Sequence, residues 1–278
     1  MNNAQIHRGP DGSGIWCENN VGFGHRRLSI IDLSKHANQP MISNNGRYIL
    51  SYNGEVYNFQ ELRKELIKKG YFFRTNSDTE VVLNALIEWN ENALDKFNGM
   101  FALALFDRKE NKIFIARDRY GIKPLYYAIQ KNTLYFASEQ KAILTQNSFN
   151  KELNKEALLE YFTFQNILTE KTLVKDINIL PAGEYILLNT KNYYSKIYSK
   201  KYWDFNFHES FKNRKEKDLI NELKFLIEQS VERQLISDVE IGSYLSGGMD
   251  SGSITAIASK YIKNLKTFTC GFDLTSAT

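Results

Sequence analysis

Apolar residues alternate with polar ones along the first two-thirds of the chain in a way that predicts several strands. Stretches rich in β-branched, aromatic and aliphatic residues, bounded by glycine and asparagine, predict strands at 21–31, 48–53 and 134–137. Residues 101–106 and 112–116 are joined across a polar turn and predict a hairpin. Because 101–106 is apolar on both alternating faces, the strand must be covered on both sides. We therefore expect two antiparallel sheets packed together and sheathed by helices.

Two helices are predicted between these strands. Residues 59–69 have helical spacing, with Asn58 in the position of an N-cap and Gly70 where a left-handed C-cap belongs. Ser77 is followed three residues later by a glutamate, which is the form of a capping box, and an apolar stripe then runs to Trp89.

The pattern changes in the last third of the chain. Residues 191–217 are polar and rich in lysine without a clear period, which indicates a linker. Helical spacing resumes over 218–236, a short strand is predicted at 239–245, and an alanine- and isoleucine-rich helix is predicted at 254–262. The predicted organisation is a first domain over 1–190, a linker over 191–217 and a second domain over 218–278.

Composition and charge narrow the class of protein. Of the 278 residues 42 % are hydrophobic, 24 % are charged and only 4 are proline, which is ordinary for a folded globular protein. The net charge of +4 is spread along the chain and does not imply a nucleic-acid partner. Cys17 and Cys270 lie far apart without a metal-binding pattern, which favours a reducing compartment. No membrane-spanning run or signal peptide is visible, so we expect a cytoplasmic protein without a membrane partner.

The turn between the last strand and helix carries candidate chemistry. Ser246-Gly247-Gly248-Met249-Asp250-Ser251 combines two glycines, two hydroxyls and a carboxylate. Free N–H groups at a helix start attract anions, and a carboxylate there can hold a Mg²⁺ that bridges phosphate oxygens. The Gly-Lys-Ser/Thr ending of a Walker loop is missing. The alternative is a tight turn that uses glycine only for its backbone freedom, and we favour the phosphate site.

This loop resembles the pyrophosphate-binding loop of the ATP pyrophosphatase superfamily. Four further motifs, in order along the chain, resemble the glutamine-hydrolysing asparagine synthetase family. They are His7-Arg8-Gly9-Pro10-Asp11, Arg26-Arg27-Leu28-Ser29-Ile30-Ile31-Asp32, Tyr52-Asn53-Gly54-Glu55-Val56-Tyr57-Asn58, and the run from Arg117 to Tyr127.

The resemblance implies a fold. The first domain is expected to be a class II glutamine amidotransferase domain, an α+β four-layer αββα fold of the Ntn-hydrolase type. The second is expected to be the beginning of an α/β parallel-sheet domain of the adenine nucleotide alpha hydrolase type.

It also implies a glutamine site in the first domain. Arg27 would bind the α-carboxylate of glutamine, Asp78 would take its α-ammonium group, and Glu55 would help to orient it. The Asn53 amide and the Gly54 N–H would form an oxyanion hole. The backbone wall is implied to come from Leu28, Ser29, Ile30 and Ile31. Taken singly these residues also fit ordinary roles, namely a surface ion pair for Arg27, a type I′ turn for Asn53-Gly54 and a helix start for Asp78.

In the second domain the resemblance implies an ATP site with Mg²⁺ held at Asp250. Its residues would be Leu245, Ser246, Gly247, Gly248, Asp250, Ser251 and Cys270. The implied reaction is the ATP-dependent amidation of aspartate to asparagine with ammonia from glutamine, giving AMP, pyrophosphate and glutamate. The implied partners are therefore small molecules: glutamine, aspartate and ATP. A homodimer is left open.

One departure from the family concerns the nucleophile. The family uses an N-terminal cysteine exposed by removal of the initiator Met, whereas here Met1 is followed by Asn2, and neither Cys17 nor Cys270 matches it. We therefore expect a chain truncated at both ends and an inactive or partial enzyme. The alternatives are a variant that uses free ammonia, an amidotransferase acting on a sugar carboxylate, a noncatalytic module that binds glutamine or nucleotide, and a partly folded product.

Overall fold

The computed structural model describes residues 1–147, 149–191, 198–207 and 214–271. It contains two compact units, Met1–Phe205 and Asn206–Thr278, which are described separately.

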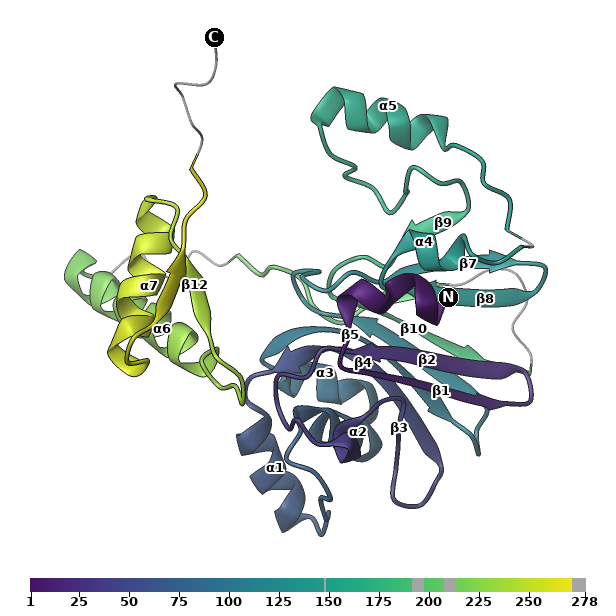
Figure 1. Cartoon of the computed structure of the whole chain (residues 1–278), viewed down its shortest axis with the longest axis horizontal. Coiled ribbons are helices and arrows are strands. Elements are labelled where there is room, and N and C mark those ends of the chain that lie inside the picture. Colours follow the sequence, from purple (N-terminus) through teal and green to yellow (C-terminus); the bar gives the residue numbers. More distant parts are fainter. Residues whose placement is uncertain (148, 192–197, 208–213, 272–278) are drawn as a thin grey trace. The chain divides into compact units, whose positions relative to one another are not determined.

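A six-stranded antiparallel sheet forms the centre of the first unit (Figure 1). All residues of 101–106, in its strand β5, are buried, which confirms that this strand is covered on both faces. The predicted hairpin of 101–106 with 112–116 is also confirmed, because β5 pairs with β6. The strand order is β11 (Ser199–Lys201), β10 (Glu184–Asn189), β6 (Lys112–Arg117), β5 (Gly99–Asp107), β4 (Tyr48–Val56) and β3 (Met41–Ile42).

Helices cover one face of this sheet, where α2 packs against β4 and α1 against α2 (Figure 1). Ser77 caps α2 as predicted, because its Oγ accepts the Thr79 N–H at 3.1 Å. Asn58 occupies the N-cap position of α1 as predicted, but its side chain makes no capping bond to the helix. Its side chain accepts the Asn98 N–H and donates to the Lys96 carbonyl, both at 2.9 Å, and so bridges to the end of α3 instead. The helices are α1 (Phe59–Lys68), α2 (Asp78–Trp89), the short η3 (Asn90–Asn92) and α3 (Ala93–Lys96).

The other face carries a second β layer made of two separate ladders. Side chains join the two ladders, since the rings of Phe23 in β2 and Phe136 in β8 pack edge to face with centroids 5.4 Å apart. The outer layer is short: η1 packs on β2 and α4 packs on β8. Together these layers give the expected αββα arrangement. The ladders are β1 (Gly12–Glu18) with β2 (Val21–Arg27), and β8 (Thr133–Ala137) with β7 (Tyr126–Gln130) and β9 (Ile177–Ile179), while the further helices are η1 (Asn2–Arg8), η2 (Lys35–Ala37), α4 (Gln140–Ile143) and α5 (Lys155–Phe164).

The first unit extends beyond the boundary predicted at residue 190. Strand β11 lies inside the predicted linker and pairs with β10. The rings of Trp203 and Phe205 pack on each other and on Tyr120, with centroids 4.8 to 6.0 Å apart, which holds the segment to this unit. Residues 192–197 and 208–213 of the predicted linker lie outside the described residues.

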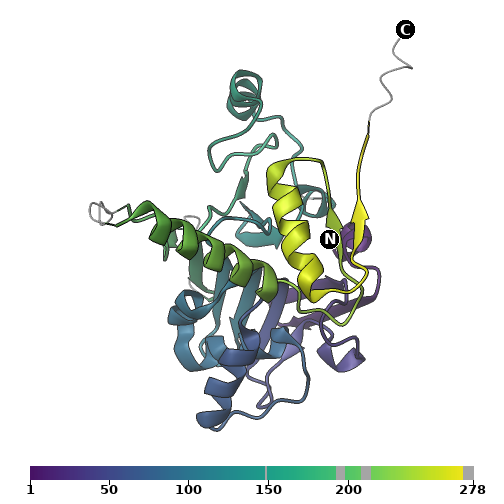
Figure 2. The same cartoon turned by 90° about the vertical axis from the view of Figure 1, so that its left-hand side faces the viewer.

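The described part of the second unit is a strand, a helix and a parallel strand. β12 (Gly242–Tyr244) and β13 (Lys266–Phe268) pair in parallel across α7 (Met249–Tyr261), and α6 (Glu216–Arg233) packs on α7 (Figure 2). This is the expected start of a parallel α/β sheet. Helix α7 begins five residues before the predicted 254, so Asp250 and Ser251 belong to its first turn. None of the described helices combines the length and the apolar character needed to cross a lipid bilayer.

Candidate functional site

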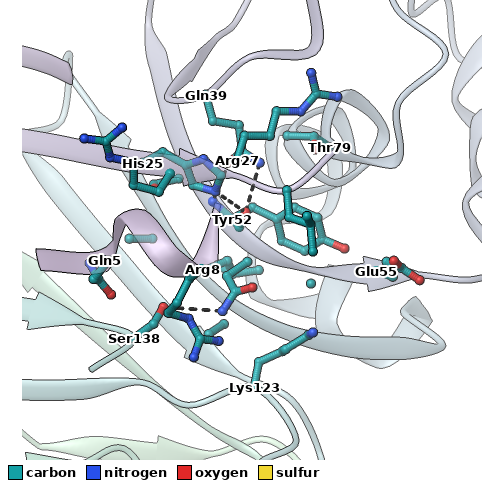
Figure 3. Close-up of a pocket in the computed structure, with 18 of the residues that line it drawn as sticks. Gln5, Arg8, His25, Arg27, Gln39, Tyr52, Glu55, Thr79, Lys123 and Ser138 are labelled. Carbon is teal, nitrogen blue, oxygen red and sulfur yellow. Dashed lines mark hydrogen bonds between the residues drawn. The ribbon is translucent and has the colours of Figure 1, made fainter. Parts of the chain in front are cut away.

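A cavity of about 230 Å³ in the first unit brings together most of the residues predicted for the glutamine site (Figure 3). Its volume lies below the roughly 300–1,000 Å³ typical of drug-sized ligands and suits a molecule the size of an amino acid. The residue that does not line it is Ser29, whose N–H is turned away to the Asp11 carboxylate at 2.8 Å. The predicted residues in its wall are Arg27, Leu28, Ile30, Ile31, Asn53, Gly54, Glu55 and Asp78.

Arg27 ends β2 and is buried, with its guanidinium engaged by the loop that follows. Nη1 donates to the Ser34 carbonyl at 2.8 Å and to the Asn38 side chain at 3.3 Å. Nη2 donates to the carbonyls of Ile31, at 3.2 Å, and Asp32. These bonds explain why the strand predicted over 21–31 ends at 27, because the loop folds around the guanidinium. A ligand carboxylate at Arg27 would compete with these carbonyls.

Two carboxylates lie at the junction of β4 and α2. Asp78 is buried, and its Oδ2 accepts the Tyr52 hydroxyl at 2.8 Å and the Val56 N–H at 3.2 Å. Burial raises the pKa of Asp78 above its ordinary value in spite of these bonds. Burial and the charge of Asp78 also raise the pKa of Glu55, against the opposing effect of Lys123. Such a pair is stabilised by a cationic ligand group.

Asn53 and Gly54 lie within β4, which excludes the hairpin-turn reading of this dipeptide. The Asn53 Nδ2 donates to the Ser138 Oγ at 3.3 Å. Gly54 meets β5 closely, since a Cβ there would lie 2.2 Å from the Met100 carbonyl oxygen. Only glycine allows this close approach of β4 to β5.

Several lining residues were not predicted from the sequence. Gln39 binds both backbone groups of Tyr52, accepting its N–H at 2.6 Å and donating to its carbonyl at 2.9 Å. His25 Nε2 lies 3.0 Å from the same carbonyl and therefore carries the proton. Burial lowers the pKa of His25 to about 4, so the ring is neutral near pH 7. Arg8 and Lys123 also line the cavity. No periodic pattern marks these residues as neighbours, because they meet only through the tertiary fold.

A buried aspartate organises the loop that carries Lys123. The Oδ1 of Asp118 accepts the N–H groups of Tyr120 and Ile122, and its Oδ2 accepts those of Phe101 and Lys123, at 2.9 to 3.1 Å. Asp118 therefore gives part of the Arg117–Tyr127 motif a structural role, because its carboxylate holds the loop against β5.

The glycine-rich loop of the second unit is closed by its two serines. The Ser246 N–H donates to the Ser251 Oγ at 3.2 Å, and their hydroxyl oxygens are 2.9 Å apart. Gly247 has a left-handed backbone with φ of +82°, which favours glycine. Helix α7 starts directly after Gly248, and the first N–H groups of a helix have no partner inside it. The loop can therefore receive an anion.

The other residues predicted for nucleotide binding border this loop. Leu245 is held to the segment that contains Cys270, because its carbonyl accepts the Thr269 hydroxyl at 2.6 Å. Asp250 is exposed in the first turn of α7. Among the described residues no group of three histidine, cysteine or acidic side chains could hold a metal by itself. Asp250 fits Mg²⁺ only as one ligand beside phosphate oxygens, as is common for this ion.

Comparison with known proteins identifies the family to which the first unit belongs. Residues 1–203 match the family model described as glutamine amidotransferase domain. The chain belongs to the glutamine amidotransferase domain family. In the same chain, residues 222–277 match the family model described as asparagine synthase.

Curated bacterial proteins are similar to the chain over most of its length. Asparagine synthetase [glutamine-hydrolyzing] 1 of Bacillus subtilis is 40 % identical over 98 % of this chain and 42 % of its own length. Asparagine synthetase B [glutamine-hydrolyzing] of Escherichia coli is 36 % identical over 92 % of this chain and 40 % of its own length. The chain thus spans less than half of these relatives.

Among solved structures, glutamine phosphoribosylpyrophosphate amidotransferase of B. subtilis, complexed with ADP and GMP, gives a TM-score of 0.46. It is 16 % identical and the match covers 89 % of this chain and 51 % of that one.

Replacing Asp118 with asparagine tests the loop that presents Lys123. We expect Asp118→Asn to lower the free energy of unfolding by about 2 to 4 kcal/mol, since the amide nitrogen would face backbone donors and leave them unsatisfied. Urea unfolding measures this. Asp176→Asn is the control, because Asp176 is exposed with φ of +64°, a conformation that asparagine also accepts. Equal stability of the two variants would contradict the assignment.

Proposed function

We propose that the cavity of the first unit binds L-glutamine, and that the chain forms part of a glutamine-hydrolysing asparagine synthetase. The observation that carries this proposal is the convergence of Arg27, the Asn53-Gly54 pair and Asp78 on one cavity. These residues are distant in sequence and supply, in one place, a cation, amide donors and a buried anion. The similarity to asparagine synthetases over both units supports the same assignment.

In this proposal the ends of glutamine are recognised by opposite charges. The α-ammonium group binds Asp78 and Glu55. Its charge stabilises the ionised form of these two carboxylates, which burial has deprived of hydration. The α-carboxylate meets the planar guanidinium of Arg27, in exchange for loop carbonyls. The side-chain carbonyl then lies at the Asn53 amide and the Gly54 N–H, where donors would stabilise a negative oxygen.

Hydrolysis of the amide requires a nucleophile in addition to this pocket. The lining of the cavity contains no cysteine. Cys17 is exposed on β1, and Cys270 belongs to the second unit. We therefore expect the described residues to bind glutamine without cleaving it.

For the second unit we propose ATP as the ligand of the loop from Ser246 to Ser251. The start of α7 and the two serine hydroxyls would hold the pyrophosphate end, with Mg²⁺ at Asp250. Bound Mg²⁺ would neutralise charge on the phosphates. The bordering backbone at Leu245 and Cys270 would contact the adenine. Aspartate as acceptor and a cytoplasmic location belong to this proposal.

Glutamine binding tests the first part of the proposal. Isothermal titration of the full chain is expected to show binding that weakens at least about tenfold in Arg27→Lys, because lysine keeps the charge but loses the bidentate fork. Arg47→Lys is the matched control: Arg47 forks onto Asp107 at 2.6 and 2.8 Å, and neither residue lines the cavity. Absent binding, or equal affinity in both variants with intact circular dichroism, would overturn the assignment.

The raised pKa values of Asp78 and Glu55 predict a pH dependence. The ammonium group of glutamine binds their ionised forms, so a proton on either carboxyl competes with the ligand. Affinity should be constant around neutral pH, where the ligand keeps its ammonium proton, and should fall as the pH decreases through these raised pKa values. His25 gains its proton only near its pKa of about 4, so it does not produce an earlier fall. Titrations at a series of pH values measure this, and affinity unchanged down to about pH 4 would contradict it.

Pyrophosphate tests the loop of the second unit. Titration of the full chain with pyrophosphate and Mg²⁺ should show binding that is lost on chelation of the metal and weakened about tenfold in Ser251→Ala. Ser259→Ala is the control on the same helix, because its hydroxyl donates to the Ala256 carbonyl at 2.9 Å and lies outside the loop. Equal binding by the two variants would remove the loop from the site.

A further inference from the structure

Tyr52 joins the middle of β4 to the first turn of α2 through its side chain. The residue is only 2 % exposed, and its hydroxyl donates to the Oδ2 of Asp78, the first residue of α2, at 2.8 Å. A hydrogen bond to a carboxylate is stronger than one between two neutral groups. The hydroxyl therefore ties one carboxylate oxygen of the cavity wall to the central sheet.

The backbone of Tyr52 is itself held in place. Strand β3 pairs with β4 at Ile49 and Leu50. Gln39 continues this edge at Tyr52, where it accepts the N–H at 2.6 Å and donates to the carbonyl at 2.9 Å (Figure 3). His25 Nε2 lies 3.0 Å from the same carbonyl. The phenol thus extends from a fixed backbone, and its hydroxyl reaches Asp78 from a defined position.

The two oxygens of the Asp78 carboxylate are bonded unequally. Oδ2 accepts the Val56 N–H at 3.2 Å in addition to the Tyr52 hydroxyl. Oδ1 faces the Ser77 hydroxyl at 3.5 Å, which is at the limit of a hydrogen bond. Because Asp78 lines the cavity, Oδ1 is the oxygen that can accept a further donor from a ligand.

The Tyr52 hydroxyl also affects the charge of Asp78. Arg27 on β2 acts on Asp78 through its charge, but its guanidinium donates to carbonyls of the following loop. Glu55 on β4 carries a like charge, and Lys123 acts on Glu55. Burial raises the pKa of Asp78, and the largest opposing effect is the hydrogen bond from Tyr52. Burial and the charge of Asp78 raise the pKa of Tyr52 well above its ordinary value, so the hydroxyl keeps its proton and remains the donor.

We propose that Tyr52 is a positioning residue for the ammonium end of the ligand: its hydroxyl holds Asp78 Oδ2, so that Asp78 stays ionised and its Oδ1 receives the α-ammonium group of an α-amino acid. The proposal rests on the proposed glutamine site and adds a residue that acts on the ligand through Asp78. Loss of the hydroxyl makes ionisation of Asp78 more costly. A proton on Asp78 competes with the ammonium group, so Tyr52 sets the pH below which the amino acid is released.

Tyr52→Phe tests this inference, because it removes the hydroxyl and keeps the ring. The first measurement is an NMR titration of the Asp78 carboxyl carbon in the full chain without ligand, with the signal identified by its loss in Asp78→Asn. The midpoint of this titration should rise by about one pH unit in Tyr52→Phe, which is about a tenfold change in the acid dissociation constant.

The second measurement is isothermal titration of the same chains with L-glutamine at a series of pH values. In Tyr52→Phe the fall of affinity at low pH should begin about one pH unit higher than in the wild type. Tyr71→Phe is the matched control. The Tyr71 hydroxyl donates to Glu88 of the same helix at 3.1 Å, and neither residue lines the cavity, so both titration curves should stay unchanged.

The outcomes separate this inference from the proposal on which it rests. An Asp78 midpoint that Tyr52→Phe leaves unmoved overturns the inference, while glutamine binding by the wild type keeps the glutamine site. A moved midpoint without a moved pH profile of glutamine binding also overturns it. So does a loss of affinity that is equal at every pH, because a purely structural role of Tyr52 would produce it. Failure of the wild-type chain to bind glutamine overturns the glutamine site itself, and this inference with it.

Discussion

Strand β4 is the structural element on which the pocket depends. It pairs with β5 along its whole length, and its residues hold the surrounding groups in place. The backbone of Tyr52 binds Gln39 and His25, its hydroxyl binds Asp78, and the Asn53 amide binds Ser138. Polar groups from the helical layer and from the second β layer thus meet at one strand. A shift of β4 by one residue would turn Asn53 and Glu55 to the opposite face.

Burial gives these polar groups their properties. Burial raises the pKa of Asp78 and lowers the pKa values of His25 and Arg27, so in each case it favours the uncharged form. Desolvation is the largest cause of all three shifts. The protein offsets this cost with hydrogen bonds rather than with close ion pairs among the three residues. The proposed zwitterionic ligand would bring an opposite charge to Asp78 and to Arg27, so its binding would offset part of the cost of burying them.

The sequence predicted those features that depend on local pattern. The Ser77 cap needs only its neighbours, and the doubly apolar run 101–106 required a covered strand wherever the chain placed it. The family resemblance predicted that Arg27, Asn53 and Asp78 belong to one site, and in the structure all three line one cavity. Long-range polar contacts were not predictable in this way. Asn58 has the spacing of a cap, but a tertiary partner, the Asn98 N–H, binds its side chain instead.

The same limit applies to Lys123 and to the end of β2. The Arg117–Tyr127 motif was visible, but its physical role depends on Asp118 reaching the N–H of Phe101, a contact across 17 positions. Strand β2 ends at Arg27 because carbonyls of the following loop surround its guanidinium. One of these carbonyls belongs to Ile31, which the sequence pattern placed in the strand. This wrapping has a consequence for the proposed complex. A ligand carboxylate that binds both Nη groups of Arg27 would displace loop carbonyls, and its bond to the guanidinium would be charged on both sides. In the proposed complex, recognition of the α-carboxylate would therefore be coupled to the conformation of the loop after β2.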